Sequence, residues 1–191
     1  MNLTKLFEMQ RELDERIVKE KGLQGRDLLP EKILALQVEL GECANEWRGF
    51  KFWSEDQESR TMQYRKVLKI FPSGDEYISR QQYNPLLEEY IDCLHFILSI
   101  GIAIGYEPLT LREYRSTADI TYMFTLLPFY AYILLDLIDQ DIEIDLVEPA
   151  YDDLLAGFLF LGAKLGFTSE QIEEAYMSKN AVNHTRQSTG Y

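Results

Sequence analysis

Cysteine and histidine are scarce in this chain of 191 residues, which contains only two of each. Two cysteines cannot form the several bridges that hold small secreted proteins together, nor can they supply the thiolates of a typical structural zinc site. Cys43 and Cys93 both lie in apolar helical patterns, where reduced thiols are expected. Since 46% of the residues are apolar, a sizeable core can form. The sequence therefore predicts a globular cytoplasmic protein.

Basic residues are also few. The chain has 19 lysines and arginines against 32 aspartates and glutamates, which gives a net charge of −13. This charge repels the phosphates of nucleic acids and of anionic membranes, so neither is expected as a partner. A small anionic substrate is still compatible with the composition, because a bound cation reverses the local sign of the charge.

Long uninterrupted hydrophobic runs are missing as well. The most apolar segments are 93–105 and 122–138, and they are interrupted by His95 and Pro128, respectively. A membrane span needs about 20 apolar residues, so both segments are interpreted as buried helices of a soluble protein. Residues 1–21 carry charges throughout, and no signal peptide is expected there.

Helical periodicity covers most of the sequence and predicts a single all-α domain over residues 1–191. Asn84 and Pro85 form a helix start signal, with an N-cap followed by proline at the first helical position. A small hairpin is expected within 66–79, and residues 180–191 are expected to form an irregular polar tail. The expected helices are 3–21, 30–47, 85 to about 101–105, two helices within 117–140 that meet near Pro128, 149–165, and 168–179 with a Thr168–Gln171 capping box.

An acidic stripe runs along the helix expected at 30–47. At about 100° per residue, Glu39, Glu42 and Glu46 share one face of that helix. This face lies directly beside the apolar stripe, whereas a solvated acidic face lies opposite it. These carboxylates are therefore expected to point toward the interior.

Glu89 and Asp92 form a second acidic pair, spaced i, i+3 in a helix that is apolar on nearly all sides after Asp92. Inward carboxylates need a counter-charge, because each unpaired buried ion costs on the order of several kcal/mol. Oxygen ligands without a cysteine or histidine pair favour Mg²⁺, with Mn²⁺ as an alternative, over zinc. The competing interpretation is that these are ordinary surface acids of a very acidic protein.

A di-iron site is another candidate, because Asp92 and His95 are also spaced i, i+3. Such a site requires two Glu-x-x-His units. The only other histidine, His184, lies in the expected tail. His95 is therefore interpreted as a core residue whose ring is hydrogen-bonded.

These acidic motifs resemble those of a known superfamily. Residues 39–42 and 89–92 read ELGE and EYID, and resemble the ExxE…ExxD signature of the MazG-like, all-α nucleoside triphosphate pyrophosphatases. Three longer strings resemble the dimeric all-α dUTPases, namely LQVELGECANEWRGFKFW, EEYIDCLHFILSIG and KNAVNHTRQSTGY. The similarity covers 3–105 and 168–191 well and the middle weakly. It implies a homodimeric helical bundle of the all-α NTP pyrophosphatase type.

The resemblance implies hydrolysis of dUTP to dUMP and pyrophosphate by a metal-activated water. It places Mg²⁺ on Glu39, Glu42, Glu89 and Asp92, and Glu39 or Glu42 would orient or deprotonate the water. Glu46 is interpreted as an acid outside this ligand set. A triphosphate carries about four negative charges, so its hydrolysis requires cations but no protein nucleophile.

The resemblance also implies contacts with the substrate. Gln10 is similar to the uracil-reading glutamine of the family, and Lys51 and Trp53 match positions at the substrate. The phosphate-binding segment of the family matches the end of the chain at Lys179, Asn180, Asn183, Arg186 and Tyr191. The alternatives from composition are a solvated Gln10, a core Trp53 and a frayed terminus.

Glu42 and Glu89 are separated by 46 residues, more than is usual in the superfamily, and the extra residues fall within 55–83. This insertion is expected to be a lid, a dimer contact or a neutral surface feature. The apolar residues of 122–138 are expected to lie near a two-fold interface. Two other functions stay open, a pyrophosphatase that accepts dCTP or other nucleotides, and a non-catalytic helical interaction protein.

Overall fold

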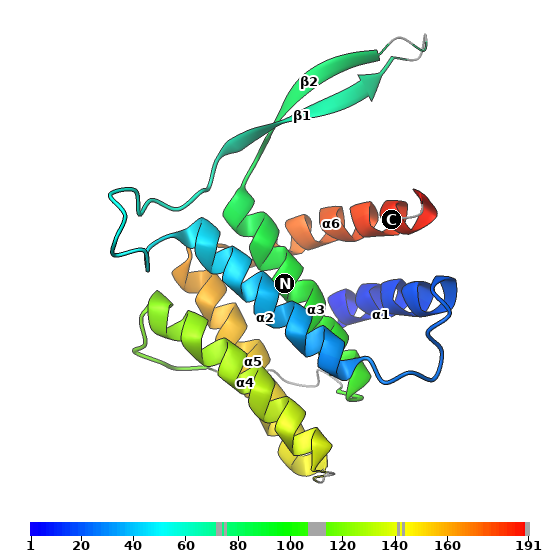
Figure 1. The fold of residues 1–191 in the computed structure, drawn as a ribbon, viewed down its shortest axis with the longest axis vertical. Coiled ribbons are helices and arrows are strands. Elements are labelled where there is room, and N and C mark those ends of the chain that lie inside the picture. Colours follow the sequence, from blue (N-terminus) through cyan, green and yellow to red (C-terminus); the bar gives the residue numbers. More distant parts are fainter. Residues whose placement is uncertain (72–73, 75, 107–113, 141, 143, 190–191) are drawn as a thin grey trace.

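The computed structural model describes residues 1–71, 74, 76–106, 114–140, 142 and 144–189. These residues form six helices and one antiparallel hairpin, which confirms the predicted all-α class (Figure 1). The elements are α1 (Leu3–Glu20), α2 (Leu29–Trp47), β1 (Gln63–Ile70), β2 (Glu76–Tyr83), α3 (Pro85–Ala103), α4 (Ile120–Asp139), α5 (Ile144–Lys164) and α6 (Ser169–Thr189).

Helix α3 is the central element of the bundle. Its start follows the predicted signal, because the Asn84 side chain accepts a hydrogen bond from the backbone N–H of Leu87 and Pro85 occupies the first turn. It packs along α2 and also contacts α1, α5 and α6. Figure 1 shows α1 and α6 side by side on one side of α2 and α3, with α4 and α5 on the other. Residues of α2 and α3 therefore face helices on both sides.

Helix α4 differs from the expectation of two helices that meet near Pro128. It is one helix that contains Pro128. A proline inside a helix removes one hydrogen bond and crowds the preceding turn. Here buried side chains on both sides of the proline, among them Met123, Leu127 and Ala131, pack the whole length as one element. Tertiary packing thus overrides the local cost.

The exposure of α4 also differs from the expectation. It is the one helix among the described residues that is long and apolar enough to cross a membrane by length and composition, and 22% of its apolar window is buried. Tyr122, Phe129 and Tyr132 are each more than half exposed. The expectation of burial is therefore correct for α3 and wrong for α4 within one subunit.

Helix α6 corrects the prediction of an irregular tail. It begins at the expected capping box of Thr168 and Gln171 and continues to Thr189. The guanidinium of Arg16 on α1 donates to the His184 carbonyl and to the Ser188 hydroxyl. These contacts hold residues 180–189 in the helix. Helix α5 likewise begins before the expected position 149, at Ile144.

The hairpin projects from the bundle near the start of α3 (Figure 1). Its antiparallel register runs from the pair Gln63–Tyr83 to the pair Ile70–Glu76. It is longer than the hairpin expected within 66–79, and it occupies most of the predicted insertion. Most of its described side chains are exposed, so it contributes little to the core.

Candidate metal and nucleotide site

Three carboxylates meet where α2 packs along α3. Glu39 on α2 and Glu89 and Asp92 on α3 each offer an oxygen, and these oxygens lie within 4.8 Å of one another. The i, i+3 spacing of Glu89 and Asp92 puts both on one face of α3, and the packing of α2 along α3 brings Glu39 to that face. All three side chains are half-buried.

The three carboxylates of this cluster repel one another. Partial burial, and then the negative charge of Asp92, raise the pKa of Glu39 from 4.5 to about 7. The same two causes raise the pKa of Glu89 to about 7. Burial also raises the pKa of Asp92, although Lys179 acts in the opposite direction. A cation that binds here would relieve both the repulsion and the loss of hydration.

Lys179 is the nearest counter-charge that the described chain supplies. Its ammonium group donates a hydrogen bond of 2.5 Å to Asp92 and lies 3.6 Å from a carboxylate oxygen of Glu88. Lys179 was predicted to bind phosphate, and in this structure it pairs with Asp92 of the acidic cluster. The predicted phosphate segment and the predicted metal ligands are therefore in direct contact.

Two other acids predicted from the sequence, Glu42 and Glu46, lie outside the group of three carboxylates. Glu42 is exposed and is not among the three residues whose oxygens meet, yet it is close enough to raise the pKa of Glu39 and Glu89. Glu46 has one carboxylate oxygen that is buried without a hydrogen-bond partner in the described structure. The converging carboxylates of Glu39, Glu89 and Asp92 fit a hard cation such as Mg²⁺ or Mn²⁺.

Gln10 is buried, with an exposed fraction of 4%, which rules out a solvated helix glutamine. Its carbonyl oxygen accepts hydrogen bonds of 2.7 Å from the Tyr176 hydroxyl and from Nδ1 of His95. Its amide nitrogen donates to Asp14 at 2.7 Å. Gln10 thus joins α1, α3 and α6 in one network.

His95 is a core residue, as predicted, but only one of its ring nitrogens is satisfied. Because Gln10 accepts, Nδ1 of His95 carries the hydrogen. Its Nε2 has no partner among the residues described. Burial lowers the pKa of His95 to about 3, so the ring is neutral at neutral pH. The ring also stacks on Tyr176 at 4.2 Å.

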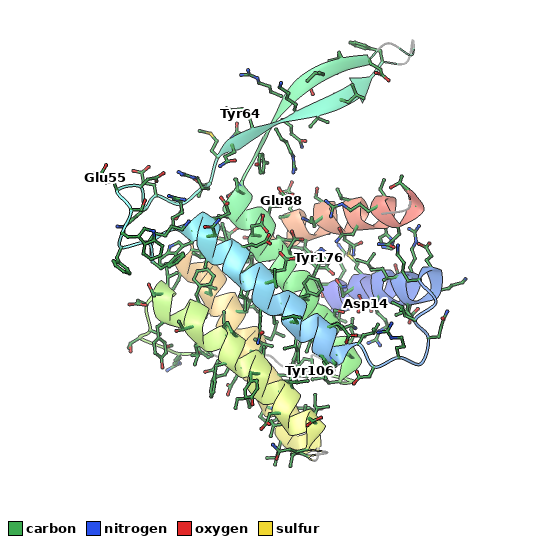
Figure 2. The ribbon with its side chains drawn as sticks, viewed as in Figure 1. Asp14, Glu55, Tyr64, Glu88, Tyr106 and Tyr176 are labelled. Carbon is green, nitrogen blue, oxygen red and sulfur yellow. The ribbon has the colours of Figure 1, made fainter. Side chains whose placement is uncertain are left out.

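A cavity of about 310 Å³ adjoins the carboxylate cluster. Several residues singled out from the sequence line it together, namely Gln10, Glu39, Asp92, Asn183 and Arg186. His95, Phe96 and Asp14 complete much of its wall. Helices α1 and α6, which carry the labelled residues Asp14 and Tyr176 in Figure 2, both contribute side chains to its wall. The volume suits a small molecule beside a metal site.

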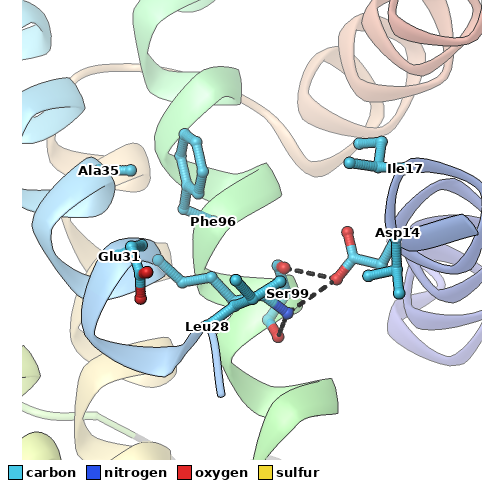
Figure 3. A pocket seen from close by; sticks show the side chains of 9 residues that line it. Asp14, Ile17, Leu28, Glu31, Ala35, Phe96 and Ser99 are labelled. Atoms are coloured by element: carbon cyan, nitrogen blue, oxygen red, sulfur yellow. Dashed lines mark hydrogen bonds and ion pairs between the residues drawn. The ribbon is translucent and has the colours of Figure 1, made fainter. Parts of the chain in front are cut away.

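A second cavity of about 330 Å³ shares Asp14, Phe96 and Ser99 with the first. Figure 3 shows how Asp14 closes one side of it, where it accepts hydrogen bonds from the Ser99 hydroxyl at 2.5 Å and from Lys32 at 3.2 Å. Asp14 was missed in the sequence. Its i, i+4 spacing from Gln10 was the signal that could have placed it on the same face of α1.

Lys51 and Trp53 are not brought into this cavity. They lie in the loop after α2, where the Lys51 ammonium donates to Asn45 and Trp53 is 65% exposed. The alternative of a core Trp53 is therefore wrong, while its role at the substrate stays a prediction. Asn180 is buried, with its amide nitrogen unpartnered among the described residues. Tyr191 lies outside the residues that the structure describes.

The raised pKa of Glu89 predicts how the wild type and Glu89→Gln differ in stability when a chelator keeps both proteins free of metal. The size of this difference should depend on pH. Between about pH 4.5 and 7, folded Glu89 keeps its proton while the unfolded chain has lost it. The free energy of unfolding therefore decreases as pH rises through this window, and the loss is complete above about pH 7. Glu89→Gln removes this loss. We expect its Tm to exceed that of the wild type by an amount that grows with pH across the window.

Thermal melts of both proteins in EDTA would measure this difference. The comparison is needed because His95, whose pKa is lowered to about 3, makes stability rise with pH over an overlapping range in both proteins. A Tm difference that stays constant with pH would contradict the assigned environment of Glu89.

A family model described as dUTPase matches residues 2–68 and 77–191 of the chain. All described residues of the carboxylate cluster and of the adjoining cavity fall within these ranges. A comparison with curated proteins gives no match.

Proposed function

Because the chain belongs to this dUTPase family and is therefore a dUTP diphosphatase, we propose that it converts dUTP to dUMP and pyrophosphate by a metal-dependent attack of water. The observation that supports this most directly is the convergence of Glu39, Glu89 and Asp92 beside a cavity of nucleotide-compatible size. When Mg²⁺ is bound, it would neutralise phosphate charge and lower the pKa of a bound water.

The chain's own residues would hold the metal and the nucleotide. Glu39, Glu89 and Asp92 form the ligand core, and Glu42 at its edge completes the set of four carboxylates. Glu39 or Glu42 would orient the attacking water or accept its proton. Mn²⁺ is an acceptable alternative to Mg²⁺, because both prefer oxygen ligands.

The base and the phosphates would occupy opposite ends of the cavity. Gln10 lies at the α1 end, where its amide could pair with one donor and one acceptor of the uracil edge. Since both ends of this amide are engaged by His95, Tyr176 and Asp14, the base would exchange with at least one of them. Asn183 and Arg186 line the same cavity from α6, and together with Lys179 they would contact the phosphates.

The assay that tests this function compares dUTP with dCTP and the other nucleoside triphosphates, each with Mg²⁺ and with chelator. The expected result is pyrophosphate release that requires the metal and is fastest with dUTP. Equal rates for all substrates would favour the broader pyrophosphatase. If none of the nucleotides is hydrolysed in a metal-dependent way, the remaining candidate function is that of a non-catalytic helical interaction protein.

The protein is also expected to be a homodimer. The exposed aromatic residues of α4, which include Tyr122, Phe129 and Tyr132, form an apolar surface that a two-fold contact would cover. Light scattering at micromolar concentration should therefore give twice the mass of one chain. An active monomer at this concentration would rule out an obligate dimer. The buried free thiols of Cys43 and Cys93 agree with the proposed cytoplasmic location.

A further inference from the structure

A separate cleft of about 390 Å³ lies where the hairpin joins the bundle. It is formed by both strands of the hairpin, the start of α3 and one side of α6. Its polar lining includes Arg65, Gln81, Tyr83, Glu88, Lys179 and Arg186. Arg186 also lines the cavity beside the carboxylate cluster, so the two spaces adjoin at this residue. Figure 2 shows Glu88 near the start of α3, on the side of the hairpin.

Three cations from two distant parts of the sequence line this cleft, although the chain as a whole is strongly acidic. Arg65 comes from β1, whereas Lys179 and Arg186 come from α6. They share the cleft with a single carboxylate among the lining residues, that of Glu88. The lining of the cleft is therefore richer in cations than the chain as a whole, whose net charge is −13, although Asp92, which pairs with Lys179, lies next to it.

Arg65 is held in place on two sides. One nitrogen of its guanidinium lies 3.0 and 3.1 Å from the two carboxylate oxygens of Glu88. The guanidinium carbon lies 4.6 Å from the ring centre of Tyr83. Glu88 is also 3.6 Å from the Lys179 ammonium, which donates to Asp92. A chain of ion pairs therefore runs from the hairpin to the carboxylate cluster.

The ion pairs that link Arg65, Glu88, Lys179 and Asp92 would rearrange when a divalent cation binds the carboxylate cluster. Asp92 would then have the cation as its counter-charge in place of Lys179. Lys179 and Arg65 would then share Glu88 alone, with Arg186 beside them. Only one guanidinium nitrogen of Arg65 contacts Glu88, and a guanidinium that turns to a phosphate can donate from two nitrogens to two of its oxygens.

We propose that this cleft binds a diphosphate group and that Arg65, from the hairpin, is one of its substrate-binding residues. The identity of the ligand rests on the proposed function. The group would be the two terminal phosphates of the nucleotide or the released pyrophosphate. This gives the insertion at 55–83 a direct part in handling the substrate.

The test compares Arg65→Gln with Lys66→Gln. Lys66 is the next residue of β1, it points to the opposite face of the strand, and it is exposed and does not line the cleft. Both variants lose one positive charge from the hairpin. Calorimetry with inorganic pyrophosphate and Mg²⁺ measures the Kd of the product, and steady-state kinetics measure KM and kcat for dUTP.

Arg65→Gln is expected to raise the Kd of pyrophosphate and the KM of dUTP about tenfold, because a charge-assisted contact is lost, while kcat changes little. Lys66→Gln should stay within about twofold of the wild type for both quantities, since only a distant, screened charge is lost. Arg65→Lys should recover part of the loss. An effect on KM alone identifies the nucleotide as the ligand, and an effect on the Kd alone identifies the product.

Glu88→Gln separates a binding role of Arg65 from a merely structural one. It removes the carboxylate that competes with phosphate, so pyrophosphate should bind more tightly than to the wild type. If Arg65 only tethers the hairpin through Glu88, this variant should instead weaken binding as Arg65→Gln does. That result, or equal behaviour of Arg65→Gln and Lys66→Gln, would overturn the proposal. Binding of pyrophosphate that depends on Arg65 in a protein without dUTP turnover would refute only the proposed function.

Discussion

Replacement of Glu89 by glutamine is expected to lower kcat/KM for dUTP by at least about a hundredfold. Glu89 provides one of the three oxygens that meet within 4.8 Å, and glutamine keeps its shape but removes a charged metal ligand. The loss of even a few kcal/mol of metal-dependent stabilisation of the transition state has an effect of this size. Steady-state assays over a range of Mg²⁺ concentrations measure it.

A matched control exists on α1, where Glu12 is exposed. Glu12→Gln makes the same change of charge away from the cluster and should retain wild-type kinetics. Circular dichroism should show that both variants are folded. If Glu89→Gln has wild-type activity at saturating Mg²⁺, Glu89 is not a metal ligand of the active site.

Glu42→Gln is expected to have the second large effect, a decrease in kcat of about a hundredfold. Glu42 is exposed and lies outside the group of three oxygens, but it is electrostatically close to Glu39 and Glu89. This position at the edge suits a carboxylate that orients or deprotonates a water, a role worth about 10² or more in rate.

The dependence of the rate on Mg²⁺ separates the two roles of Glu42. If it acts on the water, kcat decreases while the Mg²⁺ concentration for half-maximal activity stays near that of the wild type. If it is a metal ligand, this concentration increases and excess metal restores part of the rate. Unchanged kcat at every metal concentration would exclude both roles.

The helix ends that were predicted correctly are those set by capping residues close in sequence. Asn84 and Pro85 start α3, and Thr168 and Gln171 start α6, through contacts within one turn. Pro128 misled the prediction because packing on either side of it keeps α4 as one helix. The continuation of α6 past Asn180 was missed because Arg16, far away in sequence, binds its last turns.

The sequence alone determined the all-α class, and helical spacing within α2 and α3 determined which faces carry the acids Glu39, Glu89 and Asp92. Only the tertiary structure decided that Glu42 lies outside the cluster, that Gln10 is buried against His95, and that Arg65 reaches Glu88. The reason is physical. Periodicity and capping act over one or two turns of a helix, whereas the partners Gln10 and His95 are 85 residues apart and meet only when separate helices pack together.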